Sequence, residues 1–186
     1  FGELYVFDVH TEQFERIQLN DDLISFTKIF SICETQPGEI WLGTNRGLYN
    51  LNTEKLEIKR FLSSDGLPNN VVYSVIGDAQ GNIWCSTNKG ISCYKRKSGT
   101  FLNYTQKDGL QSNEFNQDAY FKSNNGTIYV GGINGLNIFH PSDIMANTFI
   151  PPVIITEMEI HYQRITPESN PDLLSRQISQ TDEIQL

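Results

Sequence analysis

The sequence QGNIWCSTNKGI at residues 80–91 repeats an earlier stretch, PGEIWLGTNRGL at residues 37–48. A third, looser version reads NGTIYVGGINGL at residues 125–136. Aligned on their leading glycines, the three copies are separated by periods of 43 and 45 residues. Repeats of roughly 40–45 residues indicate a structure built from similar units that bury their faces against one another.

Each unit contains short alternating or apolar runs that are bounded by turn residues, the pattern typical of β-strands. In the best-defined unit these runs are residues 71–76, 82–86, 91–94 and 100–104. The unit before it has runs at residues 29–34, 39–42, 48–51 and 55–62. Four strands in a repeat of this length predict an all-β fold made of four-stranded β-propeller blades.

The two ends of the repeat region match only part of a unit. Residues 4–9 and 14–19 match the last two strands of a blade, so we expect the chain to open mid-blade. The last unit has strand-like runs at residues 118–122, 127–130 and 136–139 and no evident fourth run. A complete propeller closes with about four to eight blades. We therefore expect a partial ring, cut from a longer protein, that self-associates, for example as a homodimer, or belongs to a closed ring.

The composition changes sharply after residue 140. All 14 glycines lie at or before Gly135, whereas five of the seven prolines follow it. We expect propeller repeats over residues 1–141, a linker over residues 142–152, and a second, truncated domain over residues 153–186. In that domain, every second residue from Ile154 to Tyr162 is apolar or is a threonine, which predicts one long strand.

The charge and motif content excludes several functions. A formal net charge of −8 argues against binding nucleic acid or an anionic membrane surface. The sequence has no hydrolase elbow, phosphate-binding loop, metalloprotease motif or dinucleotide-binding glycine pattern. The three histidines have no partner at metal-ligand spacing, so we expect neither a metal site nor a cofactor. A pair of catalytic carboxylates drawn from distant blades, as in a glycosidase, stays open.

The ordered motifs of this chain resemble the two-component regulator propeller family. The resemblance rests on the tryptophan-containing segments quoted above and on the loops DGLPNN at residues 65–70 and DGLQSN at residues 108–113. The segment NIFHP at residues 137–141, followed by PPVIIT at residues 151–156, is similar to that family's exit from its last blade into the immunoglobulin-like "YYY" domain. The third repeat departs from the pattern, with Tyr129 for tryptophan and Gly132 for threonine.

This resemblance implies the sensor region of a hybrid two-component system of the Bacteroidetes type. The chain would then be the periplasmic region of an inner-membrane protein, with a membrane helix and a histidine kinase downstream. It would have no enzymatic activity of its own and would bind a small ligand, for example an oligosaccharide. The alternatives are a secreted propeller glycosidase or lyase, and a structural propeller that binds a protein partner.

Candidate ligand-binding residues follow from the loops between blades, because loops on that face of a propeller usually bind ligands. The repeated Asp-Gly-Leu residues are interpreted as turn formers, since they recur with every blade. Polar side chains nearby are the better candidates, and these are Asn69, Asn70, Asn113, Glu114, Asn116 and Gln117.

Two other sets of residues are interpreted as structural. Trp41, Trp84 and Tyr129 occupy one repeat position, so we expect them to pack between blades; stacking on a sugar is the alternative. Cys85 and Cys93 flank a hairpin and are expected to lie opposite each other across it. Reduced, buried thiols are favoured, because directly paired strand positions seldom allow a disulfide; a disulfide formed in an oxidising compartment is the alternative.

Overall fold

The computed structural model describes residues 4–17, 27–144, 155–174 and 176–180. The chain divides into two compact units, Phe1–Met145 and Ala146–Leu186. The expected linker falls largely outside the described residues, as does Ile154 at the start of the expected long strand.

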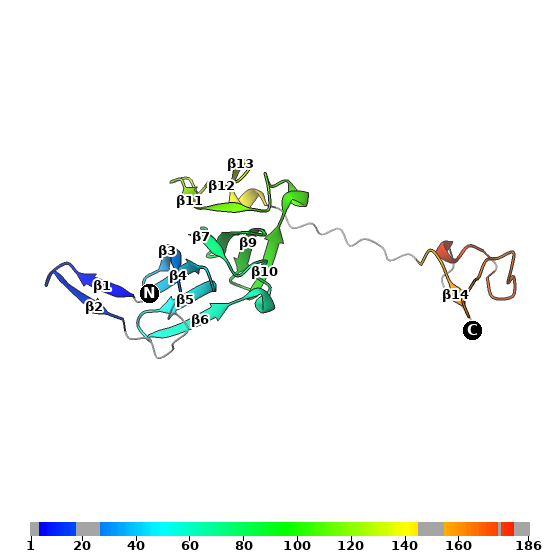
Figure 1. Ribbon diagram of the computed structural model, residues 1–186, viewed down its shortest axis with the longest axis horizontal. Helices are drawn as coiled ribbons and strands as arrows, with labels where there is room; N and C mark the ends of the chain where they lie inside the picture. Colours follow the sequence, from blue (N-terminus) through cyan, green and yellow to red (C-terminus); the bar gives the residue numbers. More distant parts are fainter. Residues whose placement is uncertain (1–3, 18–26, 145–154, 175, 181–186) are drawn as a thin grey trace. The chain divides into compact units, whose positions relative to one another are not determined.

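The first unit consists of antiparallel sheets that follow one another along the chain (Figure 1). A two-stranded hairpin comprises β1 (Tyr5–Asp8) and β2 (Gln13–Arg16). The first blade comprises β3 (Ile29–Gln36), β4 (Glu39–Thr44), β5 (Gly47–Asn52) and β6 (Glu57–Phe61). The second comprises β7 (Val72–Gly77), β8 (Ile83–Thr87), β9 (Gly90–Lys95) and β10 (Thr100–Tyr104). The third comprises β11 (Phe115–Lys122), β12 (Ile128–Gly132) and β13 (Gly135–Phe139).

Each blade is a meander in which consecutive strands are neighbours. Its first strand forms one edge of the sheet, and β7 contacts both β3 and β11. The first strands therefore lie together at the inner end of the blades, as in a propeller. The predicted all-β fold of four-stranded blades is confirmed, and among the described residues the third blade has three strands.

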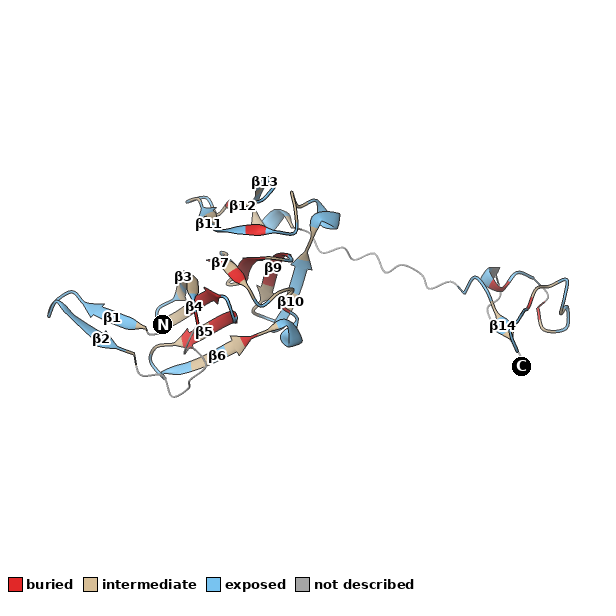
Figure 2. Cartoon of the chain, viewed as in Figure 1, coloured by how far each residue is buried: buried red, intermediate tan, exposed pale blue. Residues whose placement is uncertain are grey.

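The core lies between the blades and is centred on the repeated tryptophans. Trp41 stacks on Phe61 of its own blade at 5.7 Å between ring centroids and contacts Tyr94 of the second blade at 5.5 Å. Trp84 repeats this arrangement with Tyr104 at 5.8 Å and with Phe139 of the third blade at 5.0 Å. Both indoles are only 2% exposed. Figure 2 shows the same concentration of burial in the middle strands of the blades, whereas β1 and β2 are exposed.

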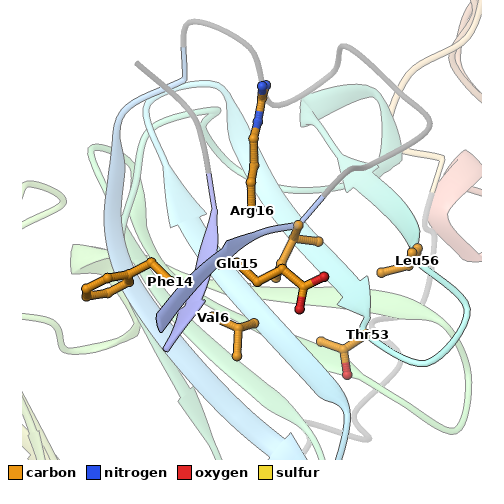
Figure 3. A pocket seen from close by; sticks show the side chains of 7 residues that line it. Val6, Phe14, Glu15, Arg16, Thr53 and Leu56 are labelled. Atoms are coloured by element: carbon orange, nitrogen blue, oxygen red, sulfur yellow. The ribbon is translucent and has the colours of Figure 1, made fainter. Parts of the chain in front are cut away.

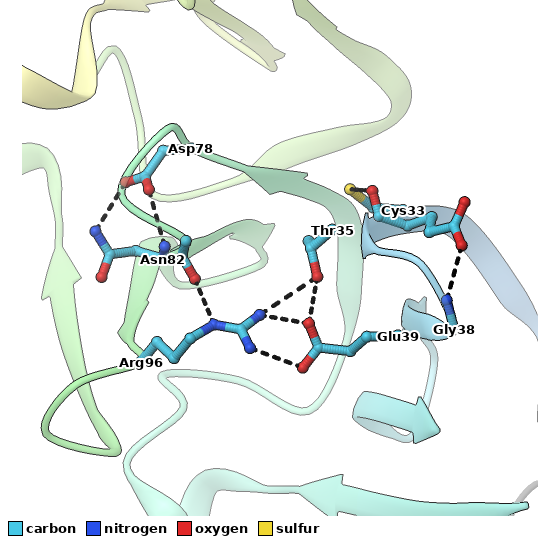
Figure 4. A network of polar contacts seen from close by, with 9 residues as sticks. Cys33, Thr35, Gly38, Glu39, Asp78, Asn82 and Arg96 are labelled. Carbon is cyan, nitrogen blue, oxygen red and sulfur yellow. Dashed lines mark hydrogen bonds and ion pairs between the residues drawn. The ribbon is translucent and has the colours of Figure 1, made fainter. Parts of the chain in front are cut away.

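A polar contact also joins the first two blades, as Figure 4 shows. Arg96, in the turn after β9, forms an ion pair with Glu39 at the start of β4. The same guanidinium donates to Thr35 Oγ1 at 3.3 Å and, within its own blade, to the Gly81 carbonyl at 2.9 Å. Because one side chain holds the turns of two blades, this contact fixes how their ends meet. We call this group the Arg96 bridge.

The threonine of the repeat closes the turn between the second and third strands. Thr44 Oγ1 donates to the Gly47 carbonyl at 2.8 Å, and Thr87 Oγ1 donates to the Gly90 carbonyl at 2.9 Å. In the third blade Gly132 takes this position, and the Gln111 side chain fills the vacated space. A Cβ atom on Gly132 would lie 2.0 Å from Gln111 Nε2, while Gln111 Oε1 accepts from Asn134 N at 2.8 Å. The departure of the third repeat is therefore an exchange of one turn-closing side chain for another.

The β1–β2 hairpin borders a hollow of about 720 Å³ beside the first blade (Figure 3). Val6 and Phe14 line it from the hairpin, and Thr53 and Leu56 line it from the turn after β5. Val6 and Phe14 are 51% and 72% exposed. The apolar side chains of the hairpin thus remain largely exposed within the described part of the chain.

The second unit is small and differs from the expected long strand. Residues 155–158 are not in a strand, and β14 (Glu159–Ile160) turns back at once into β15 (Gln163–Arg164). His161 and Tyr162 form the turn with φ values of 51° and 64°, a conformation that breaks the alternation, and Tyr162 is 99% exposed. Ile165, Leu174 and Ile178 form a small core. This unit is consistent with the start of a β-sandwich, and its assignment as immunoglobulin-like stays a prediction.

Candidate functional site

The connections between blades are built by the repeated Asp-Gly-Leu loops. Each connection contains a short 3₁₀ helix, η2 (Ser63–Asp65) or η3 (Gln106–Asp108). The helix ends at a glycine with φ near 100°. The Asp65 carboxylate accepts from Leu62 N at 2.8 Å, and the Asp108 carboxylate accepts from Thr105 N at the same distance. These aspartates and glycines therefore act as turn formers, as the sequence predicted.

Three of the four candidate asparagines also take part in these loops. Asn70 Oδ1 accepts from both Ser63 N and Ser63 Oγ, at 2.8 and 2.9 Å. Asn113 Oδ1 makes the equivalent bond to Gln106 N at 2.8 Å. Asn69 Oδ1 accepts from Val71 N at 2.8 Å. Their side-chain oxygens thus hold the loops together.

The remaining candidates are exposed: Glu114 lies just before β11, and Asn116 and Gln117 lie near its start. The register of β11 against β12 changes here: Phe115 pairs with Gly132, whereas the next paired residue, Tyr120, faces Val130. Residues 116–119 therefore lie opposite a single residue, Gly131. This is a large β-bulge in the inner strand, four residues against one, and at Asp118 its backbone reaches φ 60°.

The inner strands of the first two blades have smaller bulges at the same level. In β3, Ile29 pairs with Thr44 and Ser31 with Gly43, which leaves Phe30 as the extra residue. In β7, Val72 pairs with Thr87 and Ser74 with Ser86, which leaves Tyr73. The rings of Phe30 and Tyr73 contact each other at 5.4 Å between centroids.

The structure thus brings Phe30 and Tyr73 together and sets Asn116, Gln117 and Asp118 at the matching position of the third blade. Sequence reasoning had selected Asn116 and Gln117 but missed the other three. A signal was present, because the repeat period lengthens from 43 to 45 residues between the second and third copies. The two additional residues fall in the bulge of β11, but only the pairing register of β11 with β12 shows their position.

The repeated aromatic residues are structural in the first two blades, which confirms that prediction for Trp41 and Trp84. Trp84 Nε1 donates to Asp78 Oδ2 at 3.0 Å, so its polar atom is used within its own blade. Tyr129 differs, because it is half-buried and contacts Phe121 of the same sheet at 6.0 Å.

Two of the three cysteines lie in the core of the blades. Cys85 and Cys93 are buried and free. The expectation that they face each other is wrong: Cys93 pairs with Trp84 and Cys85 with Ser92, so the two thiols lie on opposite faces of the sheet. Burial raises the pKa of both thiols, that of Cys93 to about 11. Within the described ranges, no group of three or more His, Cys, Asp or Glu residues could hold a metal ion.

Comparison with known proteins now identifies the repeats. The profile of the two-component regulator propeller family matches residues 24–46 and 66–89, which contain the β3–β4 and β7–β8 segments. The first halves of the first two blades thus match the two-component regulator propeller repeat. The third blade continues the same architecture with the bulge and the Gly132 exchange described above.

Longer relatives cover nearly the whole chain. It is 34% identical over 177 residues to Histidine kinase P4 of Formosa agariphila, a match that spans 94% of this chain and 10% of that protein. It is 30% identical, with a TM-score of 0.69, to the extracellular domain assigned to a hybrid two-component system of B. thetaiotaomicron, over 84% of this chain and 23% of that one. A second such domain from that organism, at 20% identity and a TM-score of 0.63 over 86% of this chain and 24% of that one, shares the fold.

The chain therefore corresponds to about a tenth of the kinase and a quarter of the extracellular domains that it matches. None of the helices in the described residues is long and apolar enough to cross a membrane.

Proposed function

We propose that this chain belongs to the extracytoplasmic sensing region of a hybrid two-component system. The observation that carries the proposal is its 30% identity and TM-score of 0.69 with an extracellular domain assigned to such a system. The 34% identity with a histidine kinase over 94% of the chain supports it independently. In this proposal the chain senses a ligand and the kinase lies elsewhere in the protein.

The proposal includes the finer features implied by the family resemblance. The ligand is a carbohydrate, the region lies in the periplasm, and a membrane helix connects it to the kinase. The exposed apolar side chains of the β1–β2 hairpin support self-association, for example as a homodimer, because uncovered apolar surface favours burial against another protein surface.

Ligand binding would act by changing how the blades and the following domain pack against each other. A ligand can shift such an equilibrium only through its different affinities for the two arrangements. A change in blade packing would alter the contacts of the Arg96 bridge, because this group couples the ends of two blades through one guanidinium.

The test uses the full-length protein in membrane vesicles, with phosphate transfer from labelled ATP as the readout. We expect oligosaccharides from a panel of neutral and acidic glycans to change the extent of phosphorylation, and a variant with its kinase histidine replaced to show none. Release of shortened sugar products would instead favour a glycosidase or lyase. No response to any glycan, together with a co-purifying protein partner, would favour a structural propeller.

A further inference from the structure

We infer that the bulge residues of the three inner strands, Phe30, Tyr73 and Asn116–Asp118, form one binding site for a neutral sugar ring. We call this set the bulge site. The inference rests on the proposed carbohydrate-sensing function and adds the position and chemistry of the contact. β7 contacts the inner strand on either side of it, so three successive blades contribute to the site.

The first part of the argument is that Phe30 and Tyr73 do not belong to the core. Neither ring is a member of the inter-blade clusters formed by Trp41 and Trp84 with their neighbours. Both rings are half-buried, whereas the core tryptophans are 2% exposed. A pair of aromatic rings that contact each other at 5.4 Å, at 50° to one another, leaves apolar surface for another molecule.

The second part concerns the backbone that presents these side chains. Bulges remove a residue from the regular alternation of a strand and direct its side chain elsewhere, and they are common beside binding sites. Here bulges occur at the same level in all three blades, directly after the residue that pairs with Thr44, Thr87 or Gly132. The bulges in the first two blades present an aromatic residue, and the larger one presents an amide pair and a carboxylate.

The third part is the polar content of the large bulge. Asn116, Gln117 and Asp118 are all exposed, and Gln117 Nε2 donates to Asp118 Oδ2 at 3.2 Å. Asp118 adopts φ 60°, which is unfavourable for most residues other than glycine. The bulge therefore displays hydrogen-bond donors and acceptors at the same strand level as the aromatic pair.

An aromatic pair together with amide and carboxylate side chains fits a sugar ring. The axial C–H bonds of a pyranose are weakly positive and pack against the negative face of an aromatic ring, while its hydroxyls require both donors and acceptors. Among the five residues of the bulge site, Asp118 is the charged one, while the ammonium of Lys28 lies 5.2 Å from the centroid of the Phe30 ring. A carboxylate within the site favours a neutral sugar over a sulfated or uronic one.

The experiment uses the full-length protein on a glycan array and then titration calorimetry with the neutral oligosaccharide that binds best. We expect Tyr73→Ala and Phe30→Ala each to weaken that binding about ten-fold or more, and Asp118→Ala to weaken it by a similar factor. Tyr73→Phe keeps the ring and should retain binding within about two-fold. Phe121→Ala is the matched control: it removes an exposed aromatic from β11 beyond the bulge and should leave the affinity unchanged.

Thermal unfolding of every variant separates lost contacts from lost folding, since half-exposed rings outside the core should change the unfolding temperature little. Binding by the wild type that survives all three alanine variants would overturn the bulge site while leaving the sensing function intact. Binding restricted to acidic glycans would overturn the neutral-sugar assignment. A wild type that binds no glycan, and whose phosphorylation responds to none, would overturn the proposed function itself.

Discussion

Removing the charge of Glu39 should loosen the first blade from the second. In the wild type, Arg96 NH1 donates to Glu39 Oε1 at 3.0 Å and NH2 pairs with the other oxygen, so the contact is bidentate. Glu39→Gln keeps the size of the side chain and removes its charge. Arg96 retains Thr35 and the Gly81 carbonyl as partners, so the variant tests the ion pair rather than the whole Arg96 bridge.

The magnitude follows from how far the pair is sheltered from water. The side chains of Arg96 and Glu39 are 31% and 20% exposed. Hydrogen bonds to charged groups contribute about 1.5–3 kcal/mol when sheltered, whereas exposed ion pairs contribute about 0.2–1 kcal/mol. The pair lies between these cases, and we expect Glu39→Gln to lower the free energy of unfolding by about 1–2 kcal/mol.

The effect should also depend on pH. Burial alone would raise the pKa of Glu39, but the hydrogen bonds from Arg96 and Thr35 and the charge of Arg96 outweigh it, and the pKa lies below its ordinary value of 4.5. A carboxyl whose pKa is lowered by folding stabilises the protein above its unfolded-state pKa and loses this contribution as the pH falls through the folded-state value. The difference between wild type and variant should therefore be full at pH 7 and shrink below about pH 4.5.

The assay is urea unfolding followed by the fluorescence of Trp41 and Trp84, both of which are buried against a neighbouring blade. A double-mutant cycle with Arg96→Gln isolates the pair. Glu157→Gln is the control, because its partner Arg164 and Glu157 itself are 63% and 57% exposed, and it should change stability by less than about 0.5 kcal/mol. Additive single effects in the cycle, or a difference that is the same at pH 7 and pH 3.5, would refute the reasoning.

Three further predictions concern packing and turns. Trp84→Ala should destabilise the chain by about 3–5 kcal/mol in the same urea assay, because it empties the interface between the second and third blades, and an effect below 1 kcal/mol would contradict that packing. Gly132→Thr should lower the unfolding temperature, since its Cβ would meet Gln111 Nε2 at 2.0 Å and the Glu114 carbonyl at 2.4 Å; Gln111→Ala relieves only the first contact, so the two changes should be coupled in a double-mutant cycle, and additive effects would disprove the exchange. Asn70→Ala should cost about 1 kcal/mol by removing two hydrogen bonds of its loop, and a neutral effect measured by urea midpoint would argue against that role.

The blades could be predicted from sequence because the information that forms them is local. Alternation of side chains and turn residues such as Gly47 and Gly90, which adopt φ 131° and 98°, mark each strand end within a few residues. The interface role of Trp41 and Trp84 was also accessible, because a large residue repeated with the blade satisfies a requirement that every blade shares.

The remaining features depend on pairing that the sequence does not reveal. Tyr73 and Asp118 each lie within a longer strand-like run. Only the pairing of β7 with β8 and of β11 with β12 shows that these two residues bulge out of the strand register. The Arg96 bridge joins residues 57 positions apart, without any repeat to indicate it. The expected strand ending at Tyr162 failed for a local reason, since two non-glycine residues adopt positive φ there.

The opposed placement of Cys85 and Cys93 has a practical consequence. The side chain of Cys85 belongs to the core between the first and second blades, and that of Cys93 belongs to the core between the second and third. The first seam thus carries Cys85, with the partly buried Cys33 packed against it, and the second carries Cys93; Cys85 and Cys93 are shielded from reagents for as long as their seams stay closed. Alkylation of the two cysteines, followed by mass spectrometry of the peptides, would report the opening of the two seams separately, without any introduced label.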